Sequence, residues 1–379
     1  MPVQISPVRS RRDLARFIDV SWKIFDRKRF PVWVPPLRVT VRDALDTKNN
    51  PFYENADREL FLATANGRPV GRIAAIENRA HNRFHDDKVG FFGFFECIDD
   101  QEVADALFSA AESWLRARGL DTMRGPMNPS TNQECGLLVE GFDVHPVFMT
   151  NWNPPYFLPL MDGAGFTKAK DLYGYWYQAS GPNKLSLPPR FAALAQRAVT
   201  DSGVTFRDID IGHFDREVDV LWDIYNSAWQ KNWGFVPMTR AEFVHTAKDL
   251  KPLVDPRLAF VAEVGGKPAG VMVNLLDYAH AQVEIGNGRL FPFGFLKLLA
   301  AKRKLKSGRM MVLGIKAEHR TRSILPLFIH ELVRRAEAMD AVGGEASWIL
   351  EDNLQMVRAM ESIGAPIYRK WRIYDRPIR

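Results

Sequence analysis

A short basic stretch in front of a predicted helix is the clearest chemical signal in this sequence of 379 residues. Arg320, Arg322 and Ser323 directly precede or open the apolar pattern of a helix at 324–339. The first N–H groups of a helix have no partner inside it, and together with nearby cations they bind phosphate groups. The stretch therefore predicts an anion-binding helix start in which Ser323 caps the helix. A solvated helix entry is the plain alternative, because charges are common at helix ends.

The predicted helix at 101–118 begins with the opposite charge. Asp99 and Asp100 precede it, and carboxylates at this place cap the first N–H groups of a helix well. The same two carboxylates would repel a phosphate. Of these two helix starts, only the later one suits an anionic ligand.

Several other kinds of site are excluded by the sequence. It has no Walker loop, GxSxG, GxGxxG or metal-ligand spacing, so no metal cofactor is expected. The two cysteines, Cys97 and Cys135, are too few for a disulfide framework and indicate a reducing compartment. No secretory signal is seen, and the longest apolar stretches fall short of the about 20 residues that span a bilayer. We therefore expect a cytoplasmic protein.

The net charge of +6 is concentrated in one segment, Leu290–Arg309, and the arginine that precedes it. This region has seven cations and no acid, which leaves −1 for the rest of the chain and argues against a general nucleic-acid surface. Apolar residues at 295, 298, 299 and 305 follow helical spacing, so we expect an amphipathic helix on anionic lipid or on an acidic protein. A helix packed on its own domain is the alternative. The cations are Arg289, Lys297, Lys302, Arg303, Lys304, Lys306 and Arg309.

The composition predicts a packed globular protein with more than one domain. Hydrophobic residues make up 46% of the chain and charged residues 25%, which excludes a disordered or fibrous chain. At about 100–200 residues per domain, the length favours two domains.

An internal repeat supports that division. Phe61–Gly71 and Phe260–Gly270 share five of eleven residues at an offset of 199, and each reads as a β-hairpin with a Gly-containing turn. Gly165 and Gly364 share the same offset. A chance match of two hairpins is the alternative, but two landmarks at one offset favour a duplicated domain. We predict copies at 1–179 and 190–379, joined by a linker at 180–189.

Each copy reads as alternating helices and strands, which predicts α/β layers around a mixed sheet. After its hairpin, the first copy has a strand at 89–96, a helix at 101–118 and a strand at 121–125. The second copy has the corresponding strand, helix, strand and helix at 310–316, 324–339, 346–350 and 354–362.

This order of elements resembles the GNAT superfamily of acyltransferases, in tandem, and is most similar to a group of bacterial two-domain GNAT proteins. The resemblance implies a splayed sheet in each domain, an acyl thioester donor (acyl-CoA or acyl carrier protein) and an amine acceptor. In such folds the donor enters a V-shaped gap between the fourth and fifth strands, and its pyrophosphate lies on the next helix. The stretches that carry the resemblance are Phe91–Glu96, Gly125–Asn132, Ala228–Phe235 and Ser347–Asn353.

The resemblance places the pyrophosphate at these two helix starts, and their opposite charges predict that the second copy binds the donor. Arg320 matches the basic residue of the family pattern, whereas Ser323 and Leu325 replace its small residues. Asn353 resembles the Asn that opens the fourth helix of the family, and it would cap that helix as well. The expected donor-binding residues are Ile315, Ala317, Arg320, Arg322, Ser323 and Asn353.

Acyl transfer to an amine needs a proton acceptor and a proton donor for the leaving thiolate. The strand at 310–316 has no carboxylate, so Glu96, Asp277 and Glu284 are the candidate bases. A surface position or a cap is the alternative for Glu96, which breaks an apolar run. Met360 stands where the family often has its tyrosine acid, so Tyr368 or Tyr374 is the expected substitute, unless both are simply strand aromatics.

The resemblance leaves two classes of function open. The first is an N-acyltransferase that acts on an amine, including long-chain amino lipids such as sphingoid bases, with the first copy as partner or acceptor wall. In that case Leu290–Arg309 would dock on the inner face of the membrane or on acyl carrier protein. The second class is a non-catalytic module that binds acyl thioesters or other ligands. A small-molecule N-acetyltransferase is a further alternative.

Overall fold

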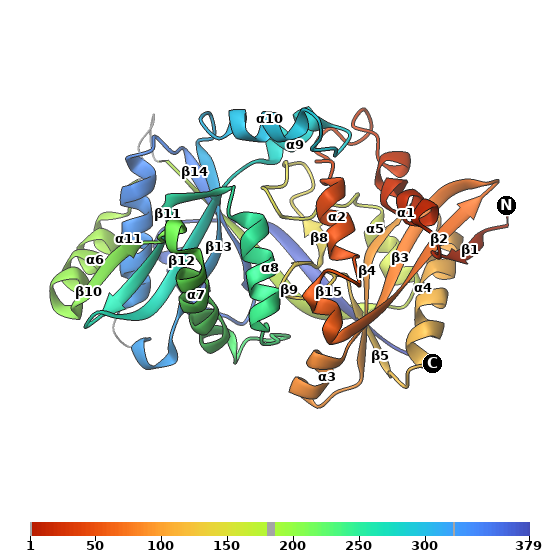
Figure 1. The fold of residues 1–379 in the computed structure, drawn as a ribbon, viewed down its shortest axis with the longest axis horizontal. Coiled ribbons are helices and arrows are strands. Elements are labelled where there is room, and N and C mark those ends of the chain that lie inside the picture. The colour runs from red at the N-terminus through yellow and green to blue at the C-terminus, as the bar shows by residue number, and fades with distance from the viewer. Residues whose placement is uncertain (1, 180–185, 321–322) are drawn as a thin grey trace. The chain divides into compact units, whose positions relative to one another are not determined.

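The computed structural model describes residues 2–179, 186–320 and 323–379 and confirms the predicted α/β fold (Figure 1). The chain forms two compact units. Unit 1 holds Met1–Leu172, Ala279–Leu299 and Arg369–Arg379, and unit 2 holds Tyr173–Tyr278 and Ala300–Tyr368. The units therefore differ from the linear halves of the predicted repeat, because two segments of the second half pack with unit 1.

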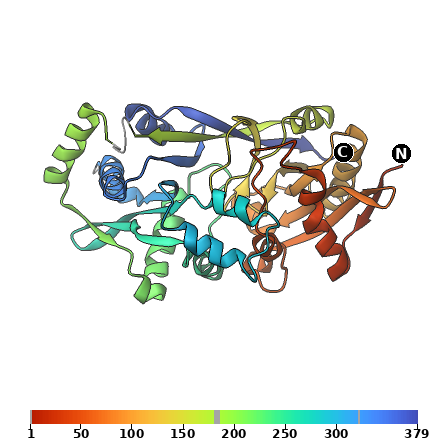
Figure 2. The same cartoon turned by 90° about the horizontal axis from the view of Figure 1, so that it is seen from above.

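Unit 1 is built around a mixed sheet with the strand order β1-β2-β3-β4-β5-β15. The predicted hairpin is β2–β3, and Asn66 and Gly67 turn it with φ angles of 51° and 73°. β15 also lies beside β9, as Figure 2 shows. The strands are β1 (Gln4–Pro7), β2 (Ala56–Ala65), β3 (Arg68–Asn78), β4 (Val89–Cys97), β5 (Thr122–Gly125), β6 (Met127–Asn128), β7 (Glu134–Cys135), β8 (Leu137–Glu140), β9 (Thr167–Gln178) and β15 (Ile367–Pro377). β9 continues into unit 2 from Tyr173, and β15 begins in unit 2 and enters unit 1 at Arg369.

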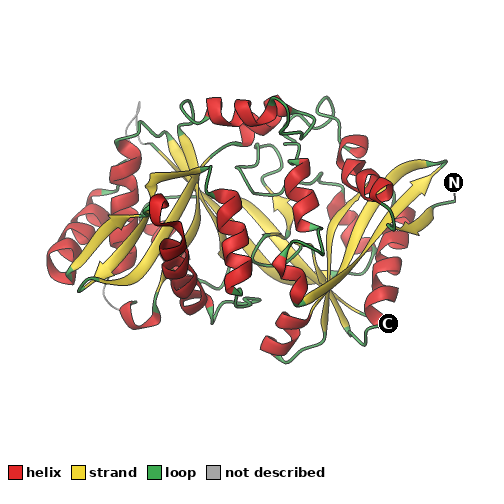
Figure 3. Ribbon diagram, in the orientation of Figure 1, coloured by secondary structure: helices red, strands yellow, loops and turns green. Residues whose placement is uncertain are grey.

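In unit 1 the helices α1 and α4 pack against this sheet (Figure 3). Aromatic side chains make up much of the core of this unit. Phe92, Phe108 and Phe166 join β4 and α4 to the loop before β9, with ring centroids 4.8–5.5 Å apart. The helices are α1 (Arg11–Ile24), α2 (Arg38–Ala44), α3 (Arg79–His85), α4 (Gln101–Arg116), α5 (Phe157–Gly163), α9 (Ala279–Ile285) and α10 (Gly294–Ala301), with a 3-10 turn η1 (Pro51–Glu54).

Unit 2 repeats the order of elements. Its sheet runs β14-β13-β12-β11-β10, and Gly265 and Gly266 turn the β11–β12 hairpin. The strands are β10 (Val204–Asp208), β11 (Val254–Val264), β12 (Lys267–Leu276), β13 (Ser307–Ile315) and β14 (Gly343–Leu350). The helices are α6 (Pro189–Ser202), α7 (Phe214–Trp229), α8 (Arg240–Leu250), α11 (Ile324–Glu337) and α12 (Leu354–Ser362), with the turns η2 (Ile211–His213) and η3 (Ala317–His319).

The segment Leu290–Arg309 differs from the single amphipathic helix that its spacing predicts. Only Gly294–Ala301 is helical, and the end of the segment belongs to strand β13. Leu298 is buried, whereas Phe295 and Leu299 are exposed. Arg309 is only 3% exposed, so it does not belong to a surface patch. The reason is that β13 pairs with β12 from Gly308 onward, which ends the irregular stretch there.

No helix among the described residues is long and apolar enough to cross a bilayer.

Candidate active site

A gap opens between β13 and β14 in unit 2. Residues Ser307–Met310 of β13 pair in parallel with Gly343–Ala346 of β14. The strands continue to Ile315 and Leu350, but they no longer pair with each other there. The register of β13 against β12 shifts by one residue directly after Met310, and such bulges re-aim a strand beside functional sites. β13 residues 310–313 are only partly buried. The unpaired strand ends can therefore accept an extended ligand between them.

A cluster of buried polar side chains lies where the pairing stops. Arg309 and Glu345 are partners in the register, and Arg309 Nε donates to Ser347 Oγ at 2.9 Å. The guanidinium is 3.7 Å from Glu345 Oε1, and the Glu345 side chain is fully buried. Ser347 and Tyr368 both donate their hydroxyl hydrogens to the Glu345 carboxylate. Such bonds offset the cost of burying the pair.

The two faces of the strands at this point differ in polarity. Side chains alternate along a strand, so Arg309 and Met310 lie on opposite faces of β13, and Glu345 and Ala346 on opposite faces of β14. Ala346 belongs to the core beneath α11, and Met310 packs against that core. The polar cluster therefore lies on the face away from α11.

An apolar cavity lies on the α11 face. It is partly open and has a volume of about 110 Å³ between the paired part of β13 and β14 and the helices α11 and α12. Its lining includes Met310, Ala346, Ile329, Ala336, Met339 and Met360, and residues 309 and 345 also border it between the strands. Met360 stands where the resemblance implies a tyrosine. In this chain the position contributes an apolar side chain to the cavity lining.

The structure places the predicted donor-binding residues at the end of β13 and the start of α11. Arg320 donates from Nε to the Ile315 carbonyl at 3.3 Å and from Nη2 to the Ala228 carbonyl at 2.5 Å. Ala317 begins the turn η3, and Arg322 lies outside the described residues. The predicted role of Ser323 as a cap is wrong, because its φ of 54° is left-handed and its side chain makes no capping bond.

Asn353 caps α12 as predicted, because its side chain accepts a hydrogen bond from the Met356 N–H group at 3.3 Å. Its role toward a donor stays a prediction.

Of the predicted catalytic residues, Tyr368 lies in the polar cluster. Glu96 lies in unit 1, where it accepts hydrogen bonds from Ser21 and pairs with the buried Arg72 at 3.0 Å. Glu284 lies on α9 of unit 1, and Asp277 follows β12 in unit 2. The roles of these carboxylates as bases stay predictions, although Glu96 already has a structural partner.

Sequence reasoning missed three members of the cluster, namely Arg309, Glu345 and Ser347. Arg309 is the last of seven cations in one segment, and such a run is typical of a solvent-exposed surface. The available signal was a charged residue inside each of two neighbouring strands. A Glu in the otherwise small and apolar stretch Gly343–Ile349 needs a buried cation, since a lone buried charge is very costly.

The corresponding gap of unit 1 is occupied by the chain itself. Only Val89–Phe91 of β4 pair with β5, and their partners are Thr122–Arg124. Beyond that point β6 enters the gap, and the Asn128 side chain accepts a hydrogen bond from the Phe94 N–H group at 2.6 Å. The Met127 carbonyl lies so close to Gly93 that a Cβ atom there would be 1.7 Å from the oxygen. No extended ligand can therefore pair at this place.

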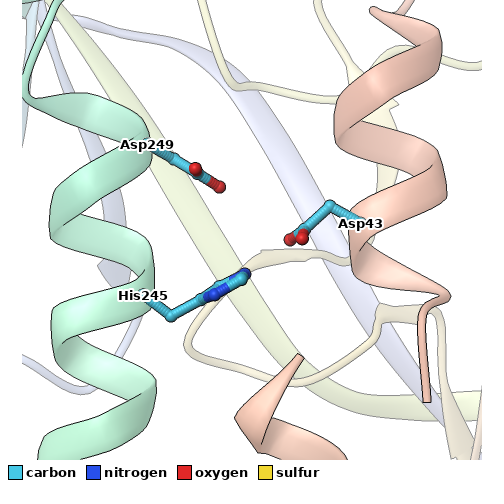
Figure 4. A group of neighbouring side chains, drawn as sticks. All are labelled: Asp43, His245 and Asp249. Carbon is cyan, nitrogen blue, oxygen red and sulfur yellow. The ribbon is translucent and has the colours of Figure 1, made fainter. Parts of the chain in front are cut away.

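Helix α8 carries two potential metal ligands. His245 and Asp249 are four residues apart, and Figure 4 shows both side chains on one face of the helix. Asp43, labelled in the same figure, belongs to α2 of unit 1. Two ligands from one helix are fewer than the three protein ligands of a catalytic zinc site, so we assign no metal here.

Comparisons with known proteins support the tandem GNAT fold. No family model matches the chain. The bacterial ceramide synthase of Caulobacter vibrioides is 37% identical over 386 residues, which cover 99% of this chain and 98% of that protein. Protein YghO of Escherichia coli is 34% identical over 375 residues, which cover 97% of this chain and 94% of that protein. A tandem GNAT protein from the clavulanic acid biosynthesis pathway aligns with 100% of this chain and 99% of its own, with a TM-score of 0.60 and 12% identity.

Proposed function

This chain belongs to the N-acyltransferase family of the bacterial ceramide synthase, and from that premise we propose that unit 2 acylates the amine of a long-chain amino lipid. The donor is of the acyl-CoA type. The observation that carries the proposal is the open gap between β13 and β14, with the Arg309–Glu345–Tyr368 cluster where the strand pairing stops.

The donor would lie in that gap. Backbone N–H and C=O groups of an unpaired strand can pair with the amides of an extended ligand, as an added strand does. The start of α11 follows β13 by a few residues, and it combines helix N–H groups with the exposed Arg320. These are the groups that bind a pyrophosphate.

The reaction needs one proton transfer at the same place. The amine nitrogen attacks the thioester carbonyl, a C–N bond forms, the C–S bond breaks, and one proton passes from the amine to the departing thiolate. The half-buried Tyr368 hydroxyl is the proton-transfer group of our proposal. Glu345 accepts its hydrogen bond, and Arg309 compensates the charge of Glu345.

A lipid acceptor is supported by the surface around α10. Phe291 and Phe293 are 78% and 70% exposed, and Leu296 and Leu299 are also exposed. Exposed apolar groups of this size mark interaction sites when they gather in one place. Exposed cations lie before, among and after them in the chain, namely Arg289, Lys297, Arg303, Lys304 and Lys306.

We propose that this basic–aromatic segment, residues 289–306, docks on an anionic bilayer. Each cation near such a surface contributes about 1 kcal/mol, and the aromatic side chains would enter the interface. An amino lipid with a long chain remains in a membrane, so docking would bring the enzyme to its acceptor.

The catalytic proposal is tested with purified enzyme, palmitoyl-CoA and sphinganine, with mass spectrometry of the amide product. The change Tyr368→Phe should lower kcat by about 100-fold or more while the calorimetric Kd for acyl-CoA stays unchanged, since only the proton-transfer group is removed. The matched control Tyr374→Phe, on the unit 1 part of β15, should keep full turnover.

Two results would contradict this assignment. Normal turnover of Tyr368→Phe would exclude Tyr368 as the proton-transfer group. Binding of acyl-CoA by the wild type without amide formation from any amine would instead favour the binding-module alternative.

The docking proposal is tested by co-sedimentation with vesicles of phosphatidylglycerol and phosphatidylcholine. Binding should require the anionic lipid and weaken with salt, because exposed charges are screened within about 8 Å at physiological ionic strength. The double change Phe291→Ser and Phe293→Ser should abolish binding, whereas Phe84→Ser, at another exposed phenylalanine, should not. Binding to acyl carrier protein instead of vesicles would overturn the lipid version.

A further inference from the structure

The apolar cavity of unit 2 is larger than ordinary packing requires. Protein interiors are close-packed, with few voids larger than a water molecule. Here a cavity opens between β13, β14 and the second half of α11, and its lining includes Leu332, Val333 and Ala336. Apolar cavities stay dry and bind apolar ligands, so this space suits a hydrocarbon better than water.

The cavity begins where the strand gap ends. Met310 and Ala346 are the last residues of β13 and β14 that pair with each other, and both belong to the cavity lining. From there the lining follows α11 from Ile329 to Ala336, seven residues or about 10 Å along the helix. A thioester held where the pairing stops would therefore have its acyl chain directed into the cavity.

In this proposal the two faces of the strands would bind different substrates. The apolar side chains of Met310 and Ala346 face the core beneath α11, and the polar cluster lies on the other face. An acyl chain on the apolar face leaves the carbonyl carbon open to an amine from the polar face. This arrangement keeps the long chain of the donor away from the acceptor.

We propose that this cavity binds the acyl chain of the donor and sets the preferred chain length. The inference rests on the proposed function, because it assumes that the donor lies in the gap of unit 2. It assigns to the cavity a ligand class, the saturated or unsaturated hydrocarbon chain of a long acyl thioester. Affinity should rise with chain length, by about fourfold for each methylene that becomes buried.

The test compares Ala336→Phe with the matched control Ala338→Phe, at the C-cap of the same helix. Ala336 lines the cavity, whereas Ala338 is exposed and does not. Calorimetry with acetyl-, octanoyl- and palmitoyl-CoA should show tighter binding of longer donors by the wild type and by Ala338→Phe. Ala336→Phe should bind palmitoyl-CoA at least tenfold more weakly and keep its affinity for acetyl-CoA.

A second variant protects the test against misfolding. Met339→Ala enlarges the cavity and should shift the preferred donor to a longer chain, even if Ala336→Phe fails to fold. Equal affinities of the wild type for acetyl- and palmitoyl-CoA would overturn the inference, as would unchanged palmitoyl-CoA binding by a folded Ala336→Phe. Continued amide formation from acetyl-CoA in either case would leave the proposed function standing. A wild type that binds no acyl-CoA at all would overturn both.

Discussion

The gaps between the fourth and fifth strands of the two copies differ in what occupies them. In unit 1 β6 follows β5 into the gap, and the Asn128 side chain accepts a hydrogen bond from the N–H group of Phe94 on β4. In unit 2 the corresponding strands β13 and β14 separate after Met310 and Ala346, beside a cavity. Nearly all of β4 is buried, whereas most of β13 is only partly buried.

This difference shows how a duplicated fold can divide its tasks. The same strand geometry leaves backbone groups unpaired in both copies, and buried backbone groups need partners. Unit 1 supplies one such partner from its own β6, the side chain of Asn128. Our proposal that a ligand takes this place in unit 2 agrees with the acidic helix start of copy one and the basic helix start of copy two.

The ion pairs of the two units also differ in burial. Arg309 and Glu345 in unit 2 have side chains 4% and 0% exposed, whereas Arg72 and Glu96 in unit 1 are 4% and 17% exposed. We therefore expect the loss of one partner to cost more in unit 2.

The largest expected effect is on the stability of unit 2. The change Arg309→Leu should lower the free energy of unfolding by about 3–5 kcal/mol, because it leaves the buried Glu345 uncompensated. Arg72→Leu should cost about 1–3 kcal/mol, because Glu96 is partly exposed and keeps the hydrogen bonds of Ser21. Urea denaturation measures both values. Adding Glu345→Gln to Arg309→Leu should restore part of the loss, and equal costs in the two units would contradict the comparison.

The next prediction tests whether β6 fills the gap between β4 and β5 in unit 1. Gly93→Ala should destabilise the protein by about 1–3 kcal/mol, because the new Cβ would collide with the Met127 carbonyl and the chain must shift. Gly67→Ala is no suitable control because its φ is positive, so we choose the exposed Val39→Ala, which should cost little. Thermal unfolding measures both. A Gly93→Ala protein as stable as the wild type would show that β6 does not fill the gap.

The smallest expected effect is on donor binding. Arg320→Glu should weaken the calorimetric Kd for CoA about tenfold, because one charge-assisted contact to phosphate is lost and a like charge is added. Asp99→Asn and Asp100→Asn in unit 1 should leave that Kd unchanged. If the unit 1 variants alter CoA binding and Arg320→Glu does not, the donor site belongs to the first copy.

Local patterns predicted much of the fold. The hairpins, the helix at Leu354–Ser362 and its cap Asn353 were readable because turn glycines, apolar spacing and capping side chains act over a few residues. The short helices α3 and α9 and the helix α6 were missed. The first two have seven residues each, too few for a clear apolar period.

By itself, the sequence determined the repeat, most of the order of elements and Tyr368 as one candidate for proton transfer. Only the tertiary structure decided that Arg309 is buried opposite Glu345, because parallel pairing joins residues far apart in the chain. It also decided that Met127 and Asn128 close one gap while its counterpart stays open. Burial and strand pairing depend on contacts between segments that are distant in the chain. The basic segment around Arg309 and the glycine at position 93 therefore do not reveal these contacts by themselves.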